Sequence, residues 1–427
     1  MPEAYVYIHL DEGPVPAGIL ETAGTGREAG ARFRYGRRYL QRSDRLPIDP
    51  VQLPLTEPDD DREYITEEGF ALFNGIRDAA PDGWGRHLMD RAAGAQALSE
   101  FDYLVATGES RVGALAFGTD LSGPRRIVPW AEADGAEGDI DGEDLDFAGM
   151  LEAVRELDTA EGLPPKHRRF LVRGSSLGGA RPKATAEFDG RQWIAKFGRP
   201  DDRSPMCRVE YVTMKLAERV GITVPTVRLE KVLGQDIYLV ERFDRVRNDK
   251  GYRRVPFISG LTILGAHESE SMGQSYRGLA DQLRRLGSAP TEDAKELWRR
   301  MIFNILCNNN DDHLRNHGFL WDGRGWRLSP GYDIVSFPQV GTERDLAIGV
   351  GHGGRRATID NALSDLAGFG LSRSEAVSMA RSMQRIVKAN WEKLCVESGL
   401  SALEIDRLRS CYIACDEQIQ AAKGNRV

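Results

Sequence analysis

Residues 307–337 read CNNNDDHLRNHGFLWDGRGWRLSPGYDIVSF and are the most informative stretch of the chain. They directly follow ELWRRMIFNILC (residues 296–307), whose apolar positions predict a helix with a broad buried face. Three asparagines, two aspartates and a histidine are costly to bury at the end of such a helix. The polar run is therefore a candidate functional site.

Two residues in this run, Asp311 and Asn316, have the D-x-x-x-x-N spacing of a protein-kinase catalytic loop. In that loop the aspartate accepts the proton of the attacking hydroxyl and the asparagine holds Mg²⁺. Asp333 follows a predicted hairpin with Asp322-Gly323 in its turn, and adds a second hard oxygen ligand of the kind that Mg²⁺ prefers. A solvated, capped loop is the alternative. The combination of apolar helix, polar loop, hairpin and isolated aspartate favours phosphoryl transfer.

A lysine that could grip nucleotide phosphates is Lys196, which follows an apolar pair in the predicted strand RQWIAKFG. The next segment, RVEYVTMKLAERVGI, has the spacing of an amphipathic helix, and its Glu210 could pair with Lys196 as a helix glutamate does in protein kinases. The alternative is a strand-edge lysine that points to water.

No kinase-type G-x-G-x-x-G covers this strand, but SSLGGARPKAT (residues 175–185) precedes it. Gly178 and Gly179 let backbone N–H groups approach an anion, and Lys183 adds charge. Ser175 and Ser176 are candidates for autophosphorylation, although composition alone favours simple turn hydrogen bonding for them.

A second nucleotide-binding segment is YLVERFDR (residues 238–245), a predicted strand that fits a hinge between two lobes. Backbone groups of Glu241 and Arg242 could bind adenine, with Phe243 packed nearby. A plain edge strand is an equal alternative.

Composition sets limits on the class of protein. A net charge of −8 argues against a uniformly basic nucleic-acid coat. No run of eighteen apolar residues and no secretory signal occur, so we expect no membrane span. Five scattered cysteines without a CxxC pair predict a reducing cytoplasm and no zinc site.

Three parts are predicted along the 427 residues. Residues 1–130 are β-rich, with strands at AYVYIHL, ARFRYGRRYL and RVGALAFG and a helix in DAAPDGWGRHLMDRAAG. An acidic stretch at 131–147 fits a linker. Residues 150–250 hold the nucleotide-binding strands, and residues 251–427 are mostly helical.

Taken together, these motifs resemble the HipA family, the serine/threonine kinase toxins of bacterial type II toxin–antitoxin systems. The matching stretches are SSLGGARPKA, IAKFG, the helix that ends in GITVP, LVERFDR, NNNDDHLRNHGF and SPGYDIVS. DAAPDGWGRHLMDR and VGALAFG are similar to the family's N-terminal part. The resemblance implies an α+β, two-lobed protein-kinase-like fold with a β-rich N-terminal subdomain and an all-helical C-terminal lobe.

The resemblance also implies roles at the site. Asp311 is then the catalytic base, Asn316 and Asp333 are the Mg²⁺ ligands, and Ser176 is the inhibitory autophosphorylation site. The expected ATP-binding residues are Gly178, Gly179, Ala180, Arg181, Pro182, Lys183, Lys196, Glu241, Arg242, Phe243, His313 and Tyr332. One departure is Asp312, where the best-known member has glycine; it leaves two candidate bases, of which the spacing favours Asp311.

Partners are implied in the same way. They are a small helix-turn-helix antitoxin (HipB-like), operator DNA bound through that antitoxin, and a protein substrate such as an aminoacyl-tRNA synthetase, with glutamyl-tRNA synthetase the expectation. Two other readings stay open. One is a small-molecule kinase, and the other is a corepressor that binds its antitoxin and has little kinase activity.

Overall fold

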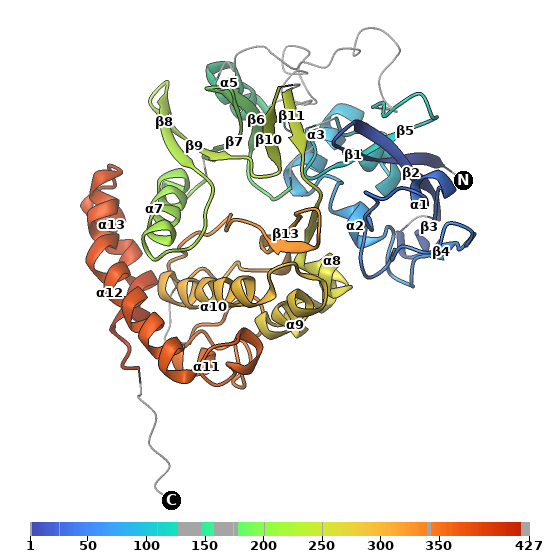
Figure 1. The fold of residues 1–427 in the computed structure, drawn as a ribbon. Coiled ribbons are helices and arrows are strands. Elements are labelled where there is room, and N and C mark those ends of the chain that lie inside the picture. The colour runs from blue at the N-terminus through green and yellow to red at the C-terminus, as the bar shows by residue number, and fades with distance from the viewer. Residues whose placement is uncertain are drawn as a thin grey trace, which may run out of the picture. The chain divides into compact units, whose positions relative to one another are not determined.

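Figure 1 presents a computed structural model of the chain. It describes residues 2–24, 26–108, 110–126, 147–157, 174, 178–199, 201–249, 251–339 and 343–419. By its contacts the chain forms two compact units, Met1–Pro200 with Glu230–Ile258 and Asp201–Leu229 with Ser259–Val427. The acidic stretch predicted as a linker lies outside the described residues up to position 146, and its last residue, Phe147, begins a helix. The three-part division expected above stays a prediction.

The first unit begins with a five-stranded sheet in the order β4-β3-β2-β1-β5. Its pairs β1–β2, β2–β3, β3–β4 and β1–β5 are antiparallel. Alternation explains the strands: in β3, Ala31, Phe33 and Tyr35 are buried while Arg32 and Arg34 face solvent. The strands are β1 (Glu3–Leu10), β2 (Gly13–Ala23), β3 (Gly30–Tyr35), β4 (Tyr64–Ile65) and β5 (Leu115–Gly118).

All three strands predicted in this part are therefore present. The stretch ARFRYGRRYL, however, is a strand only up to Tyr35, because the chain turns at Gly36 into a short helix, α1 (Arg37–Leu40). The other helices of this part are α2 (Asn74–Arg77), α3 (Gly83–Ala93) and α4 (Glu100–Ala106), and η1 (Gly26–Glu28) is a 3-10 turn. The predicted helix after Pro81 corresponds to α3.

A four-stranded sheet in the order β6-β7-β9-β8 completes the first unit, with the hairpin β10–β11. Its core contains Trp193, Phe197 and Leu239 from the strands, packed with Trp84 of α3 and Leu151 of α5 (Phe147–Leu157). The strands are β6 (Lys183–Phe188), β7 (Arg191–Phe197), β8 (Val227–Val232), β9 (Gln235–Glu241), β10 (Arg245–Asn248) and β11 (Gly251–Arg254). The predicted nucleotide-binding strands therefore form one sheet.

In the second unit, helices surround α10 (Pro290–Cys307), the helix predicted from ELWRRMIFNILC. Pro290 occupies its first turn, Glu292 and Asp293 favour its N-terminus, and Leu297, Met301 and Ile305 are fully buried. The predicted amphipathic helix with Glu210 is α7 (Met206–Arg219), and it ends just before Gly221. Helices α9 and α12 both pack on α10.

The remaining elements of the second unit are α8 (Gly260–Leu264), α9 (Tyr276–Leu286), α11 (Ile359–Ala362), α12 (Arg373–Glu397) and α13 (Ala402–Leu408). Between them lie the 3-10 turns η3 (Glu268–Gly273), η4 (Leu314–Asn316), η5 (Ala367–Phe369) and η6 (Arg409–Asp416). The predicted hairpin is β13 (Gly318–Trp321) with β14 (Trp326–Leu328), so the expected lobe is not purely helical. Strand β12 (Phe257–Ser259) carries the chain from the first unit into the second.

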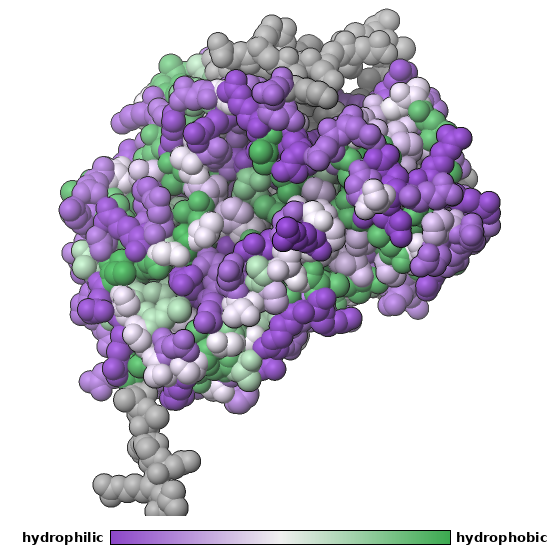
Figure 2. Space-filling model, in the orientation of Figure 1, coloured by the Kyte–Doolittle hydropathy of each residue, from purple (hydrophilic) through white to green (hydrophobic). Residues whose placement is uncertain are grey.

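The surface in Figure 2 is a mosaic, with apolar residues in separate green patches among hydrophilic ones. No helix among the described residues is long and apolar enough to span a membrane.

Candidate active site

The polar loop leaves α10 through a left-handed residue. Asn308 has φ +51°, a conformation that asparagine tolerates better than most residues, and its side-chain amide donates to the carbonyl of Phe337 at 2.6 Å. The next N–H, of Asn309, still bonds back to the Asn304 carbonyl at 3.0 Å. These hydrogen bonds end the helix at Cys307, and residues 310–313 lie in the loop that follows it.

The loop closes on itself around Asp311 and Asn316. The Asn316 side-chain amide donates to the main-chain carbonyl of Asp311 at 2.7 Å, which leaves its amide oxygen as an acceptor. The Asp311 carboxylate is 61% exposed and lies 3.9 Å from Nε2 of His313. Burial raises the pKa of Asp311, His313 lowers it and the charge of Asp333 raises it. The two carboxylates are therefore close enough to repel each other.

Asp333 is held by its own segment. It has φ +55°, and the preceding Tyr332 hydroxyl donates to the carbonyl of Arg315 at 2.6 Å. Gly331 N–H donates to the Thr223 carbonyl at 2.7 Å. The segment after the hairpin thus approaches residues 308–316, the predicted catalytic loop. This agrees with the effect of the Asp333 charge, which raises the pKa of Asp311.

Behind this segment lies a buried arginine that the sequence did not single out. Arg300 of α10 donates from Nη2 to the Ser329 carbonyl at 2.5 Å and pairs with Glu296 at 3.3 Å. Glu296 in turn accepts from the main-chain N–H of Thr223 at 3.1 Å. Burial lowers the pKa of the Arg300 guanidinium. Because this buried guanidinium bonds one carbonyl and one carboxylate, it fixes the segment that leads from β14 to Asp333.

Two carboxylates and an amide oxygen are a hard oxygen set of the kind that Mg²⁺ takes from proteins. Asp311, Asn316 and Asp333 fit this requirement chemically. The described residues contain no cluster of three or more His, Cys, Asp or Glu side chains that could hold a metal ion.

Asp312 points the other way from its neighbour. It is 1% exposed, accepts the hydroxyl hydrogen of Tyr276, and accepts the Ala347 N–H at 2.6 Å. Burial raises the pKa of Asp312 to about 6. Both of its carboxylate oxygens are occupied, whereas the carboxylate of Asp311 faces solvent. This geometry supports Asp311, which the spacing favoured, over Asp312 as the candidate base.

A hollow of ≈ 500 Å³ opens beside the catalytic loop. Asn310 and His313, which flank the two aspartates, form part of its wall, and the segment around Ala347 forms another part. Its lining residues are Ser271, Met272, Asn310, His313, Gln339, Glu343, Asp345, Leu346, Ala347 and Arg355. It has room for a side chain of a second molecule.

In the first unit, the predicted glycine loop folds against α3. Gly179 has φ +84°, which favours glycine, and its carbonyl accepts the main-chain N–H of Trp84 at 2.8 Å. The indole N–H of Trp84 donates to the carbonyl of Lys183 at 3.1 Å. Gly178, Ala180 and Arg181 form the turn, and Pro182 leads into β6. Ser175 and Ser176 lie outside the described residues.

The two predicted lysines meet across this sheet. Lys183 on β6 is the register partner of Lys196 on β7, and both are buried, at 7% and 8% exposure. Nζ of Lys196 lies 5.8 Å from the centroid of the Tyr238 ring. Two adjacent buried ammonium groups beside a glycine turn are a setting that suits an anion. The proposed partner of Lys196, Glu210, is buried on α7 in the other unit, and their pairing stays a prediction.

The predicted hinge residues use their side chains elsewhere. Arg242 donates to both carboxylate oxygens of Asp244, at 2.9 and 2.7 Å, and to the Ser110 carbonyl at 2.7 Å. Glu241 pairs with Arg191 at 2.9 Å. Phe243 packs near Phe257, with ring centroids 6.5 Å apart. The main-chain N–H of Arg242 donates to the Gln192 carbonyl at 2.8 Å, and the expected main-chain contact with a nucleotide base stays a prediction.

Asp244 is the centre of a buried network that sequence reasoning missed. Its carboxylate, with its side chain 4% exposed, accepts from Arg242, from Arg245 at 2.8 Å and from the Gly113 N–H at 2.8 Å. These arginine charges hold the pKa of Asp244 well below its usual range, despite the burial. The only sequence signal was the run RFDR itself, since Gly113 is 131 residues away.

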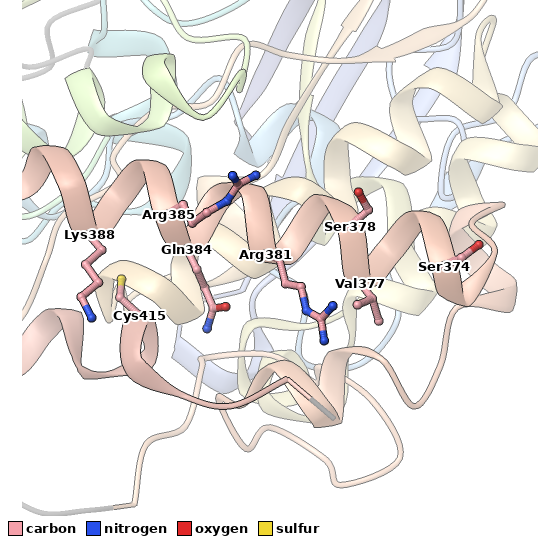
Figure 3. A pocket seen from close by; sticks show the side chains of 8 residues that line it. All are labelled: Ser374, Val377, Ser378, Arg381, Gln384, Arg385, Lys388 and Cys415. Carbon is pink, nitrogen blue, oxygen red and sulfur yellow. The ribbon is translucent and has the colours of Figure 1, made fainter. Parts of the chain in front are cut away.

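Another hollow, of ≈ 620 Å³, lies along α12, far along the chain from the catalytic loop. Figure 3 shows Arg381, Gln384 and Lys388 projecting from α12 on the side of Cys415. Gln384 donates to the Ala414 carbonyl at 2.9 Å, and Lys388 pairs with Asp416 at 2.5 Å. None of the candidate catalytic or nucleotide-binding residues lines this hollow.

The fold as a whole is that of a kinase-like protein of the HipA type. A solved chain from the Shewanella oneidensis MR-1 toxin–antitoxin complex of HipA, HipB and operator DNA superposes with a TM-score of 0.67, over 96% of this chain and 95% of that one, at 17% identity. The expected α+β, kinase-like fold class is confirmed.

Family models give the same result. The HipA-like C-terminal domain matches residues 175–391, and the HipA N-terminal domain matches residues 7–118. The chain belongs to the HipA family.

Two relatives illustrate the distance within the family. The chain is 25% identical over 342 residues to the Sinorhizobium fredii protein named "Putative kinase Y4mE", covering 76% of this chain and 77% of that protein. It is 26% identical over 189 residues to the serine/threonine-protein kinase toxin HipA of Shewanella oneidensis, covering 38% of this chain and 43% of that protein.

Proposed function

We propose that this chain is an ATP-dependent serine/threonine protein kinase and the toxin of a HipBA-like toxin–antitoxin system. The observation that carries the proposal is the grouping of Asp311, Asn316 and Asp333 in one loop system, with Asp311 exposed and electrostatically coupled to Asp333. Asp333 raises the pKa of Asp311 by charge repulsion, and a cation held by Asp333 would relieve that repulsion.

In the proposed reaction Asp311 accepts a hydrogen bond from the acceptor hydroxyl and takes its proton as the hydroxyl oxygen bonds to the γ-phosphorus of ATP. The bond from that phosphorus to the β,γ-bridging oxygen breaks, and ADP leaves with the electron pair. General-base terms of this kind contribute about 10²–10⁴ in rate. His313, 3.9 Å from the Asp311 carboxylate, lines the hollow from which we expect the hydroxyl to approach. Asn316 fixes the loop through the Asp311 carbonyl, which orients the base.

The remaining predicted site residues would bind the nucleotide. Asp333 and the amide oxygen of Asn316 would hold Mg²⁺, which neutralises charge on the phosphates of bound ATP. Lys183 and Lys196 would bind phosphate oxygens, and the turn from Gly178 to Pro182 would cover them. Main-chain groups of Glu241 and Arg242, with Phe243, His313 and Tyr332, complete the proposed nucleotide contacts.

The proposed partners follow from family membership. They are a small helix-turn-helix antitoxin like HipB, operator DNA reached through it, and an aminoacyl-tRNA synthetase, with glutamyl-tRNA synthetase first, as substrate. We also propose autophosphorylation at Ser176, with Ser175 the alternative, and a cytoplasmic location. The kinase-named relatives and the similarity to HipA support these assignments.

The test is incubation of the purified chain with Mg²⁺ and γ-labelled ATP, with and without glutamyl-tRNA synthetase, followed by mapping of phosphosites by mass spectrometry. Label on a serine or threonine of either protein supports the proposal. Label that appears only on small molecules of a lysate indicates a small-molecule kinase. A chain that binds its antitoxin but transfers no phosphate is a corepressor.

A further inference from the structure

A chain of buried hydrogen bonds runs from the catalytic loop into the body of the second unit. The side-chain amide of Asn309 donates to Oδ1 of Asn304 at 3.1 Å, and that of Asn304 donates to the Tyr276 hydroxyl at 2.8 Å. The Tyr276 hydroxyl donates to Oδ2 of Asp312, whose Oδ1 accepts the Ala347 N–H at 2.6 Å. Four segments are joined: α10, the catalytic loop, the start of α9 and the strand-like stretch around residue 347.

Burying the polar side chains of this hydrogen-bonded series costs free energy unless each is hydrogen-bonded. Tyr276 is fully buried, and Asn304, Asn309 and Asp312 are between 1% and 3% exposed. A carboxylate at that depth is tolerated only when its oxygens are bonded, as both are here.

The main chain of Asp312 is fixed as well as its side chain. Its carbonyl is hydrogen-bonded to Nε2 of His317 at 3.1 Å. The ring of His317 packs edge-on against Tyr276, with centroids 5.2 Å apart. With carboxylate and carbonyl both held, residue 312 cannot rotate without breaking three hydrogen bonds.

Two consequences follow for the site. Asp311 immediately precedes residue 312, so the fixed main chain of residue 312 restricts the directions in which the Asp311 carboxylate can point. Ala347, the other end of the hydrogen-bond chain, lines the same hollow as Asn310 and His313. The bond from Ala347 to Asp312 therefore ties one part of the wall of that hollow to the loop that carries Asp311.

We propose that Asp312 and Tyr276 are positioning residues. They hold Asp311 and the wall of the adjoining hollow in the positions that the acceptor hydroxyl requires. Neither touches reacting atoms. This inference rests on the proposed kinase function and extends it to the acceptor side of the site.

The kinetic test compares Tyr276→Phe and Asp312→Asn with Tyr39→Phe as a matched control. Tyr39 is also a buried tyrosine whose hydroxyl donates once, to the Leu46 carbonyl at 2.6 Å, and accepts once, from the Leu46 N–H at 3.1 Å, but it lies in the first unit. The probe is transfer of labelled phosphate from ATP to glutamyl-tRNA synthetase and to the chain itself. We expect Tyr276→Phe and Asp312→Asn to lower kcat at least tenfold and to leave the Kd for ATP within twofold.

The control variant Tyr39→Phe must keep the wild-type kcat and the wild-type Kd for ATP. A Tyr276→Phe protein that turns over within twofold of wild type, or whose whole loss is explained by weaker ATP binding, overturns the inference. If the wild type itself transfers no phosphate to any acceptor, the kinase proposal has failed, and the inference that rests on it fails with it.

Amide hydrogen exchange at Ala347 tests the hydrogen bond independently of activity. Asp312→Ala is used here because asparagine keeps an oxygen that can accept the Ala347 N–H. Exchange should accelerate at least tenfold in Asp312→Ala and stay unchanged in Tyr39→Phe. Unchanged exchange at Ala347 in Asp312→Ala would contradict the positioning role even in an active enzyme, and would leave the proposed kinase function standing.

Discussion

Asp311 and Asp312 are neighbours in the chain, yet the side chain of Asp311 is 61% exposed and Asp312 is 1% exposed. The same functional group therefore occupies two environments one residue apart. One carboxylate faces solvent beside Asp333, and the other is bonded to Tyr276 and Ala347 inside the protein. This division lets one aspartate act on a substrate while the other fixes the loop.

A first prediction concerns the metal. Replacing Asp333 by asparagine removes the charged member of the two oxygen ligands, Asn316 and Asp333, that we assign to Mg²⁺. We expect the Mg²⁺ concentration for half-maximal phosphate transfer to rise at least tenfold. Asp322→Asn is the matched control, because Asp322 accepts from Ser288, Arg324 and Gly325 in the nearby hairpin turn and should leave the Mg²⁺ requirement unchanged. Equal Mg²⁺ curves for Asp333→Asn and wild type would contradict the ligand assignment.

A second prediction concerns the buried network around Asp244. Asp244→Asn leaves the buried guanidiniums of Arg242 and Arg245 without their carboxylate, and breaking such a pair costs about 3–5 kcal/mol of unfolding free energy. Urea denaturation followed by tryptophan fluorescence measures the loss. The control is Asp61→Asn, which removes an ion pair with Arg37 at the surface and should hardly move the midpoint. Similar midpoint shifts for the two variants would refute this explanation.

A third prediction is a pH dependence that arises from Asp49. Burial raises the pKa of Asp49 to about 6, above the value of about 3.9 expected in the unfolded chain. Between these pH values the folded chain keeps a proton that the unfolded chain has lost. The stability contributed by this group is therefore complete below about pH 4 and is lost as the pH rises through 6.

The measurement for Asp49 is the unfolding free energy of wild type relative to Asp49→Asn at several pH values, which cancels the other titrating groups. The wild type should lose about 2 kcal/mol relative to the variant between pH 4.5 and pH 7.5. A difference that is flat across this range, or that grows with pH, would mean that Asp49 keeps an ordinary pKa.

A fourth prediction concerns the glycine loop. Trp84→Phe keeps an aromatic ring in the core but removes the indole N–H that donates to the Lys183 carbonyl at 3.1 Å. We expect the KM for ATP to rise several-fold with little change in kcat, because the loop that we assign to the phosphates loses one of its two bonds to α3. Trp321→Phe, on the hairpin β13–β14, serves as the control. An unchanged KM for ATP in Trp84→Phe would mean that the bond from α3 to the glycine loop does not influence nucleotide binding.

Local sequence predicted those parts of the fold that depend on local pattern. The alternation in β3, the apolar face of α10 and the Asp322-Gly323 turn are each visible within ten residues, and each is present in the structure. The boundary at Gly36 was missed because Tyr39 and Leu40 are apolar residues that a strand also accepts, whereas in the structure they are the buried residues of α1.

The buried polar networks were not predictable, because their partners lie far apart in the chain. Tyr276 is 36 residues from Asp312, and Gly113 is 131 residues from Asp244. In the sequence, Asp311 and Asp312 are adjacent aspartates, and only the burial of Asp312 in the structure distinguishes their environments. Such contacts emerge when α9 packs on α10, which no sequence window contains.

The most direct test of the central claim is the rate of phosphate transfer from Mg-ATP by Asp311→Asn, measured beside wild type on glutamyl-tRNA synthetase and on the chain itself. The variant keeps the size of the side chain and loses its ability to take a proton. We predict a fall in kcat of about 10²-fold or more, with ATP affinity within twofold. Transfer by Asp311→Asn at the wild-type rate would contradict the assignment of Asp311 as the base and, with it, the proposed mechanism.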